Sequence, residues 1–231
     1  MQAFDHSIVF FLNQFAQRWR VFDGMVIFLS NSDLMKGGVV IAAIWWAWFY
    51  RKGDAKTHRS YLLSALFGSL VALFFARVFA HAFPLRVRPI LDPSLHFRPP
   101  LGLPSQSNWT IWSSFPSDHA ALFCALLTGV WLVSRRAGIA LMLYVIIGIC
   151  LPRIYVGIHY PSDVLMGAGL GVFCVLLCSW SKIRLGWTGA VISWIDRRPG
   201  PGYACLFIIT FQIATLFWDI RTLLFFFDVS V

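Results

Sequence analysis

Residues 153–180 read RIYVGIHYPSDVLMGAGLGVFCVLLCSW, a polar cluster followed by an apolar run of membrane length. Basic side chains and imidazoles are costly in hydrocarbon, so a group of them at the end of such a run indicates a site. Two more polar clusters, at 86–89 and 116–119, also lie where an apolar run begins or ends. The polar side chains of the quoted segment that matter most below are Arg153, His159 and Asp163.

The composition is that of a membrane protein rather than of a soluble domain. Of the 231 residues, 58% are hydrophobic and 13% are charged, whereas soluble domains carry about 25% charged residues. The net charge of +9 comes from 19 Lys and Arg against 10 acidic residues, all of them Asp. Because no basic run or basic patterned helix accompanies this charge, we do not expect nucleic acid as a partner.

The apolar runs predict an all-α fold, a polytopic transmembrane helical bundle of about six spans, with 1–231 forming a single domain. An amphipathic helix lying at the membrane interface is expected over about 4–17. An apolar stretch near 21–29 is too short to span. The expected spans are about 35–50, 60–82, 118–134, 138–155, 162–181 and 204–225.

The basic residues of the short connections fall on one side of this predicted bundle. The positive-inside rule assigns that side to the cytoplasm, which places the polar clusters on the opposite face. We therefore expect a multi-pass protein of the plasma (inner) membrane with an extracytoplasmic active site. The ten residues are Arg51, Lys52, Lys56, Arg59, Arg135, Arg136, Lys182, Arg184, Arg197 and Arg198.

The connection from about 83 to 115 is the longest one, and six of the 11 prolines fall in it. Proline stiffens a loop without giving it regular structure. The loop could act as a lid over the site or as a plain tether, and the sequence favours neither strongly.

In the quoted segment, Pro161 is suited to be the first residue of a helix, which puts Asp163 in the first turn, where a carboxylate is favourable. We expect Asp163 to accept a hydrogen bond from one ring nitrogen of His159, leaving the other nitrogen free to attack a phosphate. Arg153 offers a fork of donors that matches phosphate oxygens. The alternative is a helix-capping Asp beside an interfacial His.

The cluster at 116–119 also reads as a helix start, with Pro116 in the first turn and open backbone amides at Ser117 and Asp118. A helix N-terminus with a hydroxyl beside it is suited to an anion. His119, at the same depth, would be the general acid for a leaving oxygen. The alternative is a Pro-Ser cap with an incidental His.

The cluster at 86–89 contains Arg86 and Arg88, which could stabilise the spread charge of a phosphoryl transition state. A surface pair of arginines would look the same. Arg77 and His81 lie four residues apart and share one face of the predicted helix, and we interpret Arg77 as structural.

In order and spacing, these residues resemble the three signature motifs of the type-2 phosphatidic-acid phosphatase and vanadium haloperoxidase superfamily. The motifs are Lys-x6-Arg-Pro, Pro-Ser-Gly-His and Ser-Arg-x5-His-x3-Asp, and the resemblance covers about 60–180. It implies that His159 is the nucleophile that forms a phosphohistidine, that Asp163 is its partner and that His119 is the acid for the leaving group.

The resemblance also implies that Arg88, Arg153 and Ser117 hold the phosphate and that the reaction needs no metal or other cofactor. We place Arg86 and two residues that depart from the motifs at the same phosphate site: His81, where the family has Lys, and Asp118, where it has Gly.

A neutral His81 would bind phosphate less strongly than Lys, and Asp118 would repel it unless the carboxylate turned away or paired with an Arg. A third departure is Pro152, which replaces Ser.

The Pro-Ser-Asp-His form and the stretch 81–84 resemble bacterial undecaprenyl-diphosphate phosphatases. The implied substrate is a lipid phosphate or isoprenoid diphosphate held among membrane lipids, with undecaprenyl diphosphate first. Phosphatidic acid, phosphatidylglycerophosphate and a lipid A phosphate remain alternatives. A non-catalytic anion-binding or lipid-binding membrane protein is the alternative from another class.

Overall fold

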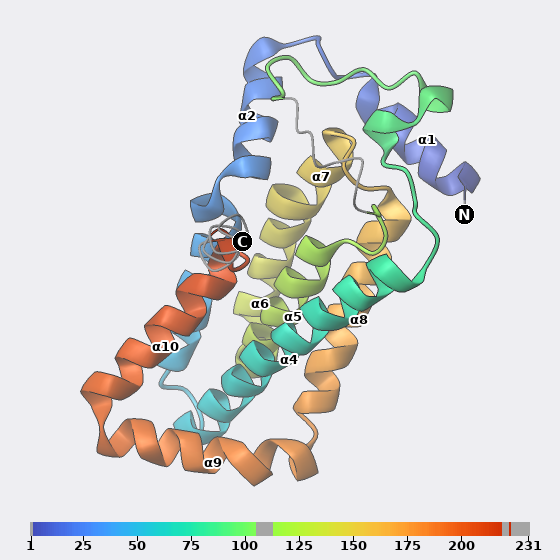
Figure 1. Ribbon diagram of the computed structural model, residues 1–231. Helices are drawn as coiled ribbons and strands as arrows, with labels where there is room; N and C mark the ends of the chain where they lie inside the picture. The colour runs from blue at the N-terminus through green and yellow to red at the C-terminus, as the bar shows by residue number, and fades with distance from the viewer. Residues whose placement is uncertain (1, 105–112, 219–221, 223–231) are drawn as a thin grey trace, which may run out of the picture.

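The computed structural model describes residues 2–104, 113–218 and 222, and this part of the chain is helical, without a β-strand (Figure 1). The first half holds α1 (Gln2–Asn13), α2 (Arg20–Asn31), the π-helical turn η1 (Leu34–Gly38), α3 (Val39–Trp48) and α4 (Ala55–Ala82). Two 3-10 turns follow, η2 (Pro89–Leu91) and η3 (Pro93–Leu95). The second half holds α5 (Asp118–Val133), α6 (Arg135–Tyr144), η5 (Val145–Cys150), α7 (Leu151–Tyr155), α8 (Pro161–Cys178), α9 (Ser181–Arg197) and α10 (Pro199–Ala214).

The helices α4, α5 and α8 form the centre of the bundle, and glycines bring α5 and α8 close together. A Cβ on Gly167 would lie 2.3 Å from the carbonyl oxygen of Ser117, and one on Gly171 would lie 2.1 Å from that of Ala121. Small residues at such contacts let helix backbones approach closely in a membrane. This packing aligns the N-terminal ends of α5 and α8, where two of the three polar clusters lie.

The predicted all-α membrane bundle is confirmed. Among the described residues, three helices are long and apolar enough to cross a membrane: α4, the continuous helix Arg135–Tyr155 and α8. Two further predicted spans correspond to α5 and α10, which are apolar but have 16 residues each. The predicted span 204–225 begins inside α10, and most of its last seven residues lie outside the described part of the chain.

The prediction for residues 20–50 needs correction. Instead of one span over 35–50 with a separate short stretch at 21–29, α2 and η1–α3 form a pair of helices bent by 66°, which together could make one span. The helix breaks after α2 because Ser32 adopts an extended backbone, and η1 then restarts it.

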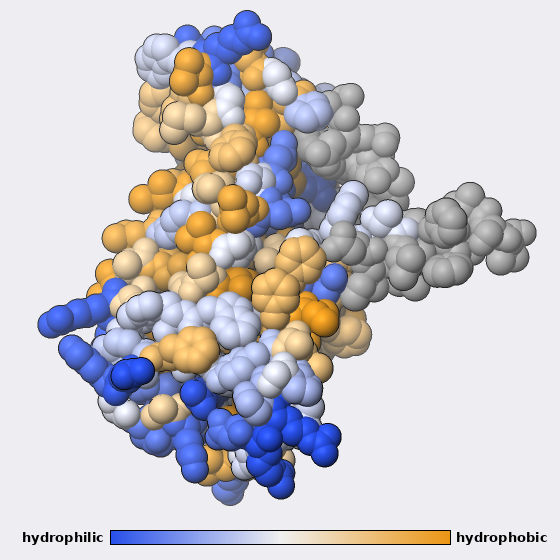
Figure 2. Space-filling model, turned by 90° about the vertical axis from the view of Figure 1, so that its left-hand side faces the viewer, coloured by the Kyte–Doolittle hydropathy of each residue, from blue (hydrophilic) through white to orange (hydrophobic). Residues whose placement is uncertain are grey.

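The segment between α8 and α10, predicted as a connection, is the helix α9, which lies across one end of the bundle (Figure 1). The first half of its buried face is polar: Arg184 donates to Ser60 Oγ at 3.0 Å, and the hydroxyls of Ser60 and Thr188 lie 2.6 Å apart. The second half is apolar, with Ile192 and Ile195 buried. In Figure 2 hydrophilic residues gather at this end of the molecule, below a mainly apolar band.

The predicted interfacial helix over 4–17 is α1, which is shorter and ends at Asn13. Phe4, Phe10 and Phe11 are exposed, whereas Asp5 is fully buried on the opposite face. The helix packs against α7 and α8 at the end of the bundle opposite α9, and residues 83–104 run over the same end (Figure 1).

Candidate active site

Backbone hydrogen bonds join the three polar clusters at one end of the bundle. The amide of Ser114 donates to the carbonyl oxygen of Arg86 at 3.0 Å, and that of Ser117 donates to Asp163 at 3.1 Å. The amide of Ile90 donates to Gly157 at 2.9 Å, which ties the loop after α4 to the connection between α7 and α8. The three clusters therefore lie side by side at this end of the bundle.

The connection between α7 and α8 places His159 in the interior. Gly157 turns the chain with a φ of +75°, and a Cβ there would lie 2.7 Å from the ring of Phe97. The amide of His159 then donates to the Arg153 carbonyl oxygen at 3.3 Å, which closes the turn. The ring is buried, with only 5% of the residue exposed.

The side chain of His159 is oriented by a backbone carbonyl group. Its Nδ1 lies 2.8 Å from the Ser114 carbonyl oxygen, and because a carbonyl only accepts, Nδ1 carries the proton. Nε2 is then the unprotonated nitrogen of the neutral ring. Burial, together with the nearby Arg88, lowers the pKa of His159 to about 3, so the ring is neutral at physiological pH.

The expected hydrogen bond between His159 and Asp163 is wrong. Asp163 Oδ2 accepts from the amide of Tyr160 at 2.8 Å, and Oδ1 accepts from Arg86. The carboxylate thus caps α8, the alternative that the sequence left open, and it fixes the residue next to His159 rather than the imidazole itself.

The expected contact of Arg86 with phosphate also needs correction. Its Nη2 donates to Asp5 Oδ2 at 2.7 Å, and its Nη1 donates to Asp163 and, at 2.9 Å, to Ser162 Oγ. The guanidinium stacks over the ring of Tyr160, 4.3 Å from its centroid. Arg86 is paired with two buried carboxylates, so its donors are already used within the protein.

Asp118 is bonded to His119 and Arg77 rather than facing an anion. Its Oδ1 lies 2.8 Å from His119 Nδ1, and its Oδ2 accepts from Arg77 Nη2 at 2.7 Å. The repulsion expected from a carboxylate beside phosphate is therefore offset by an arginine. This contact also explains Arg77, which was interpreted from the sequence as structural.

His119 Nε2 faces Arg153, whose Nη2 hydrogen-bonds to it. Arg88 Nη1 donates to the carbonyl oxygen of Ile158 at 3.2 Å. The Nε groups of both Arg88 and Arg153 are buried without a hydrogen-bond partner among the described residues. Buried donors of this kind are rare unless a ligand or water completes them, which marks this side of the site as suited to an anion.

Ser117 caps α5: its hydroxyl accepts from the amide of Ala120 at 3.4 Å. The sequence suggested that the Ser117 amide is open to an anion. It is not, because it donates to the carbonyl oxygen of Asp163. A donating hydroxyl proton is thus what Ser117 can offer to a phosphate.

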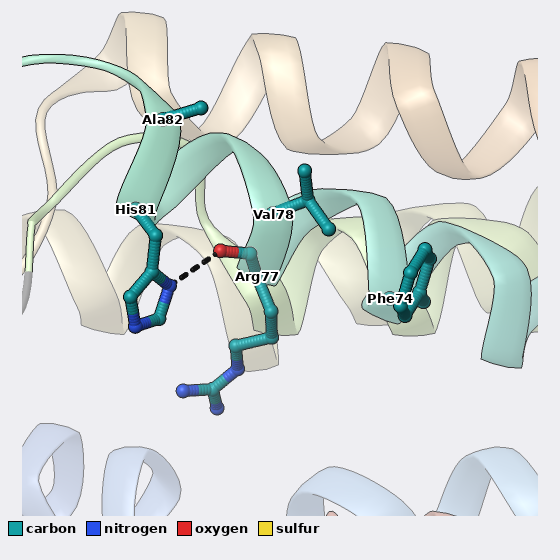
Figure 3. Close-up of a pocket in the computed structure, with 5 residues that line it drawn as sticks. All are labelled: Phe74, Arg77, Val78, His81 and Ala82. Atoms are coloured by element: carbon teal, nitrogen blue, oxygen red, sulfur yellow. Dashed lines mark hydrogen bonds between the residues drawn. The ribbon is translucent and has the colours of Figure 1, made fainter.

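His81 lies at the last turn of α4, where its Nδ1 hydrogen-bonds to the Arg77 carbonyl oxygen at 2.7 Å (Figure 3). Together with Phe74, Val78 and Ala82, these two residues line an open groove of about 460 Å³. The groove is largely apolar, and Arg77 connects it with Asp118. His81 thus lines the groove beside the polar cluster.

Two buried charged residues of the N-terminal part were not singled out from the sequence. Lys36, in the bend between α2 and α3, forms an ion pair with Asp33 at 3.2 Å and interacts electrostatically with Arg153 and Asp118. Asp5 pairs with Arg86. Asp5 stands at the start of one apolar run and Lys36 at the start of another, which was the available signal.

In the described part of the chain, no group of three or more His, Cys, Asp or Glu side chains is arranged to hold a metal ion.

The model of the PAP2 superfamily matches residues 61–187, more than half of the chain and all three motifs, and the chain belongs to this superfamily. The predicted family is thereby confirmed. Asp5 and Lys36 lie outside the matched region.

Individual relatives match shorter segments. The chain is 34% identical over 85 residues to the bacitracin transport permease protein BcrC of Bacillus licheniformis, which covers 37% of this chain and 41% of that protein. It is 41% identical over 58 residues to the decaprenylphosphoryl-5-phosphoribose phosphatase of Mycobacterium tuberculosis, covering 25% and 31%. The chain thus spans less than half the length of these relatives.

Among solved structures, a PAP2-type phosphatidylglycerolphosphate phosphatase from Bacillus subtilis superposes with a TM-score of 0.47 at 22% identity, covering 76% of this chain and 83% of that one.

Proposed function

We propose that this protein is a membrane lipid phosphatase whose preferred substrate is an isoprenoid diphosphate, with undecaprenyl diphosphate converted to undecaprenyl phosphate. The observation that carries the proposal is the meeting of a neutral, carbonyl-oriented His159 with His119 and the cations Arg88 and Arg153 at one end of a membrane bundle. The mycobacterial relative, a decaprenylphosphoryl-5-phosphoribose phosphatase, supports a polyprenyl substrate.

In the proposed first step, His159 Nε2 attacks the terminal phosphorus. A nitrogen–phosphorus bond forms, and the bond from phosphorus to the bridging oxygen breaks. Nε2 of His119 accepts from Arg153 in the free protein; in the proposed complex Arg153 turns to the phosphate, and Nε2, having taken up a proton from solvent, donates it to that leaving oxygen. Asp118 supports this role because its carboxylate, 2.8 Å from Nδ1, stabilises the positive form of the His119 ring.

In the second step, His119 accepts a proton from water, and the hydroxide oxygen attacks the phosphohistidine. The nitrogen–phosphorus bond breaks, inorganic phosphate leaves, and His119 is protonated again for the next cycle. Arg88, Arg153 and the Ser117 hydroxyl hold the phosphoryl oxygens through both steps, where positioning and charge supply most of the rate. No step in this scheme requires a metal ion.

Lys36 supplies a further positive charge in this proposal. The family motif has Lys at the position of His81, which here bonds to its own helix. Lys36 is buried in the bend between α2 and α3. Its ammonium group interacts electrostatically with Arg153, Asp118 and His119. It can therefore replace, from another helix, the charge that His81 lacks when neutral.

The isoprenoid tail is proposed to remain in the bilayer along the groove at the end of α4. That groove is open and largely apolar, with Arg77 at its side (Figure 3). Arg77 is bonded to Asp118 of the polar cluster. The basic connections lie at the other end of the helices, which supports a site on the extracytoplasmic face of the plasma membrane.

The test is phosphate release from a panel of lipids by purified protein and by His159→Ala in parallel. The panel contains undecaprenyl diphosphate, phosphatidic acid, phosphatidylglycerophosphate and a lipid A phosphate. We expect the highest kcat/KM for the diphosphate, no turnover by the variant at equal membrane insertion, and full activity in excess chelator. Near-wild-type phosphate release by His159→Ala would show that His159 is not the nucleophile. Activity that is lost in chelator and restored by a divalent ion would contradict the metal-free scheme.

A non-catalytic role is the second candidate, and the name of the Bacillus licheniformis relative, a transport permease, is the observation that favours it. A transporter needs a path to both membrane faces, whereas the polar clusters of this chain gather at one end of the bundle. Tight, saturable lipid binding without phosphate release from any lipid of the panel would favour this candidate.

A further inference from the structure

The helix α1 contains a buried carboxylate, Asp5, that contacts residues next to the candidate site. Asp5 is fully buried and lies on the same face as Val9 and Asn13, whereas Phe4 and Phe10 are exposed. A buried carboxylate is costly unless it is paired and hydrogen-bonded. The contacts of Asp5 therefore show what this helix is built to hold.

Asp5 caps α8 from a distance of 157 residues along the chain. Its Oδ1 accepts from the amide of Ser162 at 2.8 Å, and its Oδ2 accepts from the Ser162 hydroxyl at 2.6 Å. The amides of the first helical turn lack partners within their own helix, so that a carboxylate supplied by another helix is a strong cap.

The same carboxylate is connected to the residue beside His159. Arg86 bridges Asp5 and Asp163, and Asp163 in turn accepts the amide of Tyr160 at 2.8 Å. Burial would raise the pKa of Asp5, but the hydrogen bonds from Ser162 and the charge of Arg86 outweigh it and hold the pKa below its usual value. Asp5 therefore contributes a full negative charge, which balances Arg86 together with Asp163.

A second contact fixes the other end of α1. The side chain of Asn13 donates to the carbonyl oxygen of Arg98 at 2.7 Å and accepts its amide at 3.0 Å. The helix is thus fastened both to the start of α8 and to the loop after α4, with its phenylalanines on the outer face.

We propose that Asp5 is a positioning residue for the phosphatase reaction: it holds the His159 segment in its working geometry by capping α8, and α1 thereby couples the site to the membrane interface. This inference rests on the proposed function. A misplacement of a reacting group by about 1 Å can cost about 10²-fold in rate, so that the effect should fall on kcat.

The experiment compares Asp5→Asn with Asp54→Asn in the full chain. Asp54 caps α4 at the other end of the bundle, accepting from the amides of Lys56 and Thr57, so it is an exposed Asp cap without a link to the site. We expect Asp5→Asn to lower kcat on undecaprenyl diphosphate about 10- to 100-fold with KM changed less than about two-fold. Asp54→Asn should keep kcat and change the unfolding temperature little, because Asn caps a helix about as well as Asp.

A conservative variant and a double variant separate positioning from plain loss of stability. Asp5→Glu, which keeps the charge, should recover part of kcat. In an Arg86→Gln background the direct cap on Ser162 remains but the bridge to Asp163 is already broken, so the two losses should be less than additive. Equal kcat losses in Asp5→Asn and Asp54→Asn, or additive effects in the double variant, would overturn the proposal.

Hydrogen exchange provides a readout that does not need turnover. Asp5→Asn should increase the exchange of the amides of residues 160 and 162–164, and Asp54→Asn should leave them unchanged. Unchanged exchange in Asp5→Asn overturns the positioning role even in an inactive protein. If the wild-type protein releases no phosphate but Asp5→Asn still increases the exchange of these amides, only the proposed function is overturned.

Discussion

The two histidines of the site are held by different groups, and the difference separates their proposed roles. Nδ1 of His159 faces the carbonyl oxygen of Ser114, whereas Nδ1 of His119 faces the carboxylate of Asp118. A carbonyl oxygen fixes a tautomer without adding charge, which suits a neutral nucleophile. A carboxylate stabilises the positive ring, which suits a group that donates and accepts protons.

Removing the proton carrier should have the largest effect among the changes that probe this contrast. We expect His119→Ala to lower kcat on undecaprenyl diphosphate by about 10²- to 10⁴-fold, because the leaving oxygen then departs without a proton. Steady-state phosphate release checks this. Activity within a few-fold of wild type would show that His119 is not the acid.

Weakening the carboxylate should cost less than removing the imidazole. Asp118→Asn keeps the shape and a hydrogen bond to His119 but loses the charge, and we expect kcat to fall about 10²-fold. Arg77→Gln is the matched control, because it breaks the ion pair with Asp118 but leaves the carboxylate on the ring. A larger loss of kcat in Arg77→Gln than in Asp118→Asn would contradict the role assigned to the Asp118 carboxylate.

The charge proposed to reach the site from Lys36 should affect binding more than chemistry. We expect Lys36→Met to raise KM about ten-fold, the equivalent of roughly 1.4 kcal/mol of binding. Adding His81→Lys should recover part of this loss, because it restores a cation at the family position. The exposed Lys52, at the opposite end of the bundle, provides the control variant Lys52→Met, which should keep the wild-type KM.

The smallest effect on kcat/KM should come from lowering the pH, because His159 stays neutral. With a pKa lowered to about 3, His159 is neutral above that pH, so that its protonation should change kcat/KM less than about two-fold between pH 5 and 6.5. An unperturbed imidazole would instead lose its neutral form as the pH falls through about 6.5. The pH profile of kcat/KM, corrected for ionisation of the lipid phosphate by phosphorus NMR, distinguishes the two cases.

The sequence predicted the helices because apolar runs of membrane length leave few alternatives to a bundle. It failed where charge and helix formation occur together: α9 carries Lys182, Arg184 and Arg197 and was therefore assigned to a connection. The bend at Ser32 depends on the backbone of one residue, which hydrophobic periodicity does not report.

The candidate site was predicted as a group of residues but not as a set of contacts. The spacing of His159 and Asp163 suggested a direct hydrogen bond, yet both oxygens of Asp163 are used by the Tyr160 amide and Arg86. The pairing of Arg86 with Asp5 depends on how α1 packs against α8, and a single sequence carries no signal for that contact. Local motifs therefore predicted which residues come together, while long-range packing decided which charge faces which.

The most direct test of the account is to trap the covalent intermediate. Undecaprenyl diphosphate with radioactive phosphorus in its terminal phosphate is mixed with the protein, the reaction is quenched in denaturant at alkaline pH, and the labelled peptide is identified by mass spectrometry. The account predicts an acid-labile phosphoryl group on His159, lost in His159→Ala. A label on His119 instead, or phosphate release in a single turnover without any labelled histidine, would contradict it.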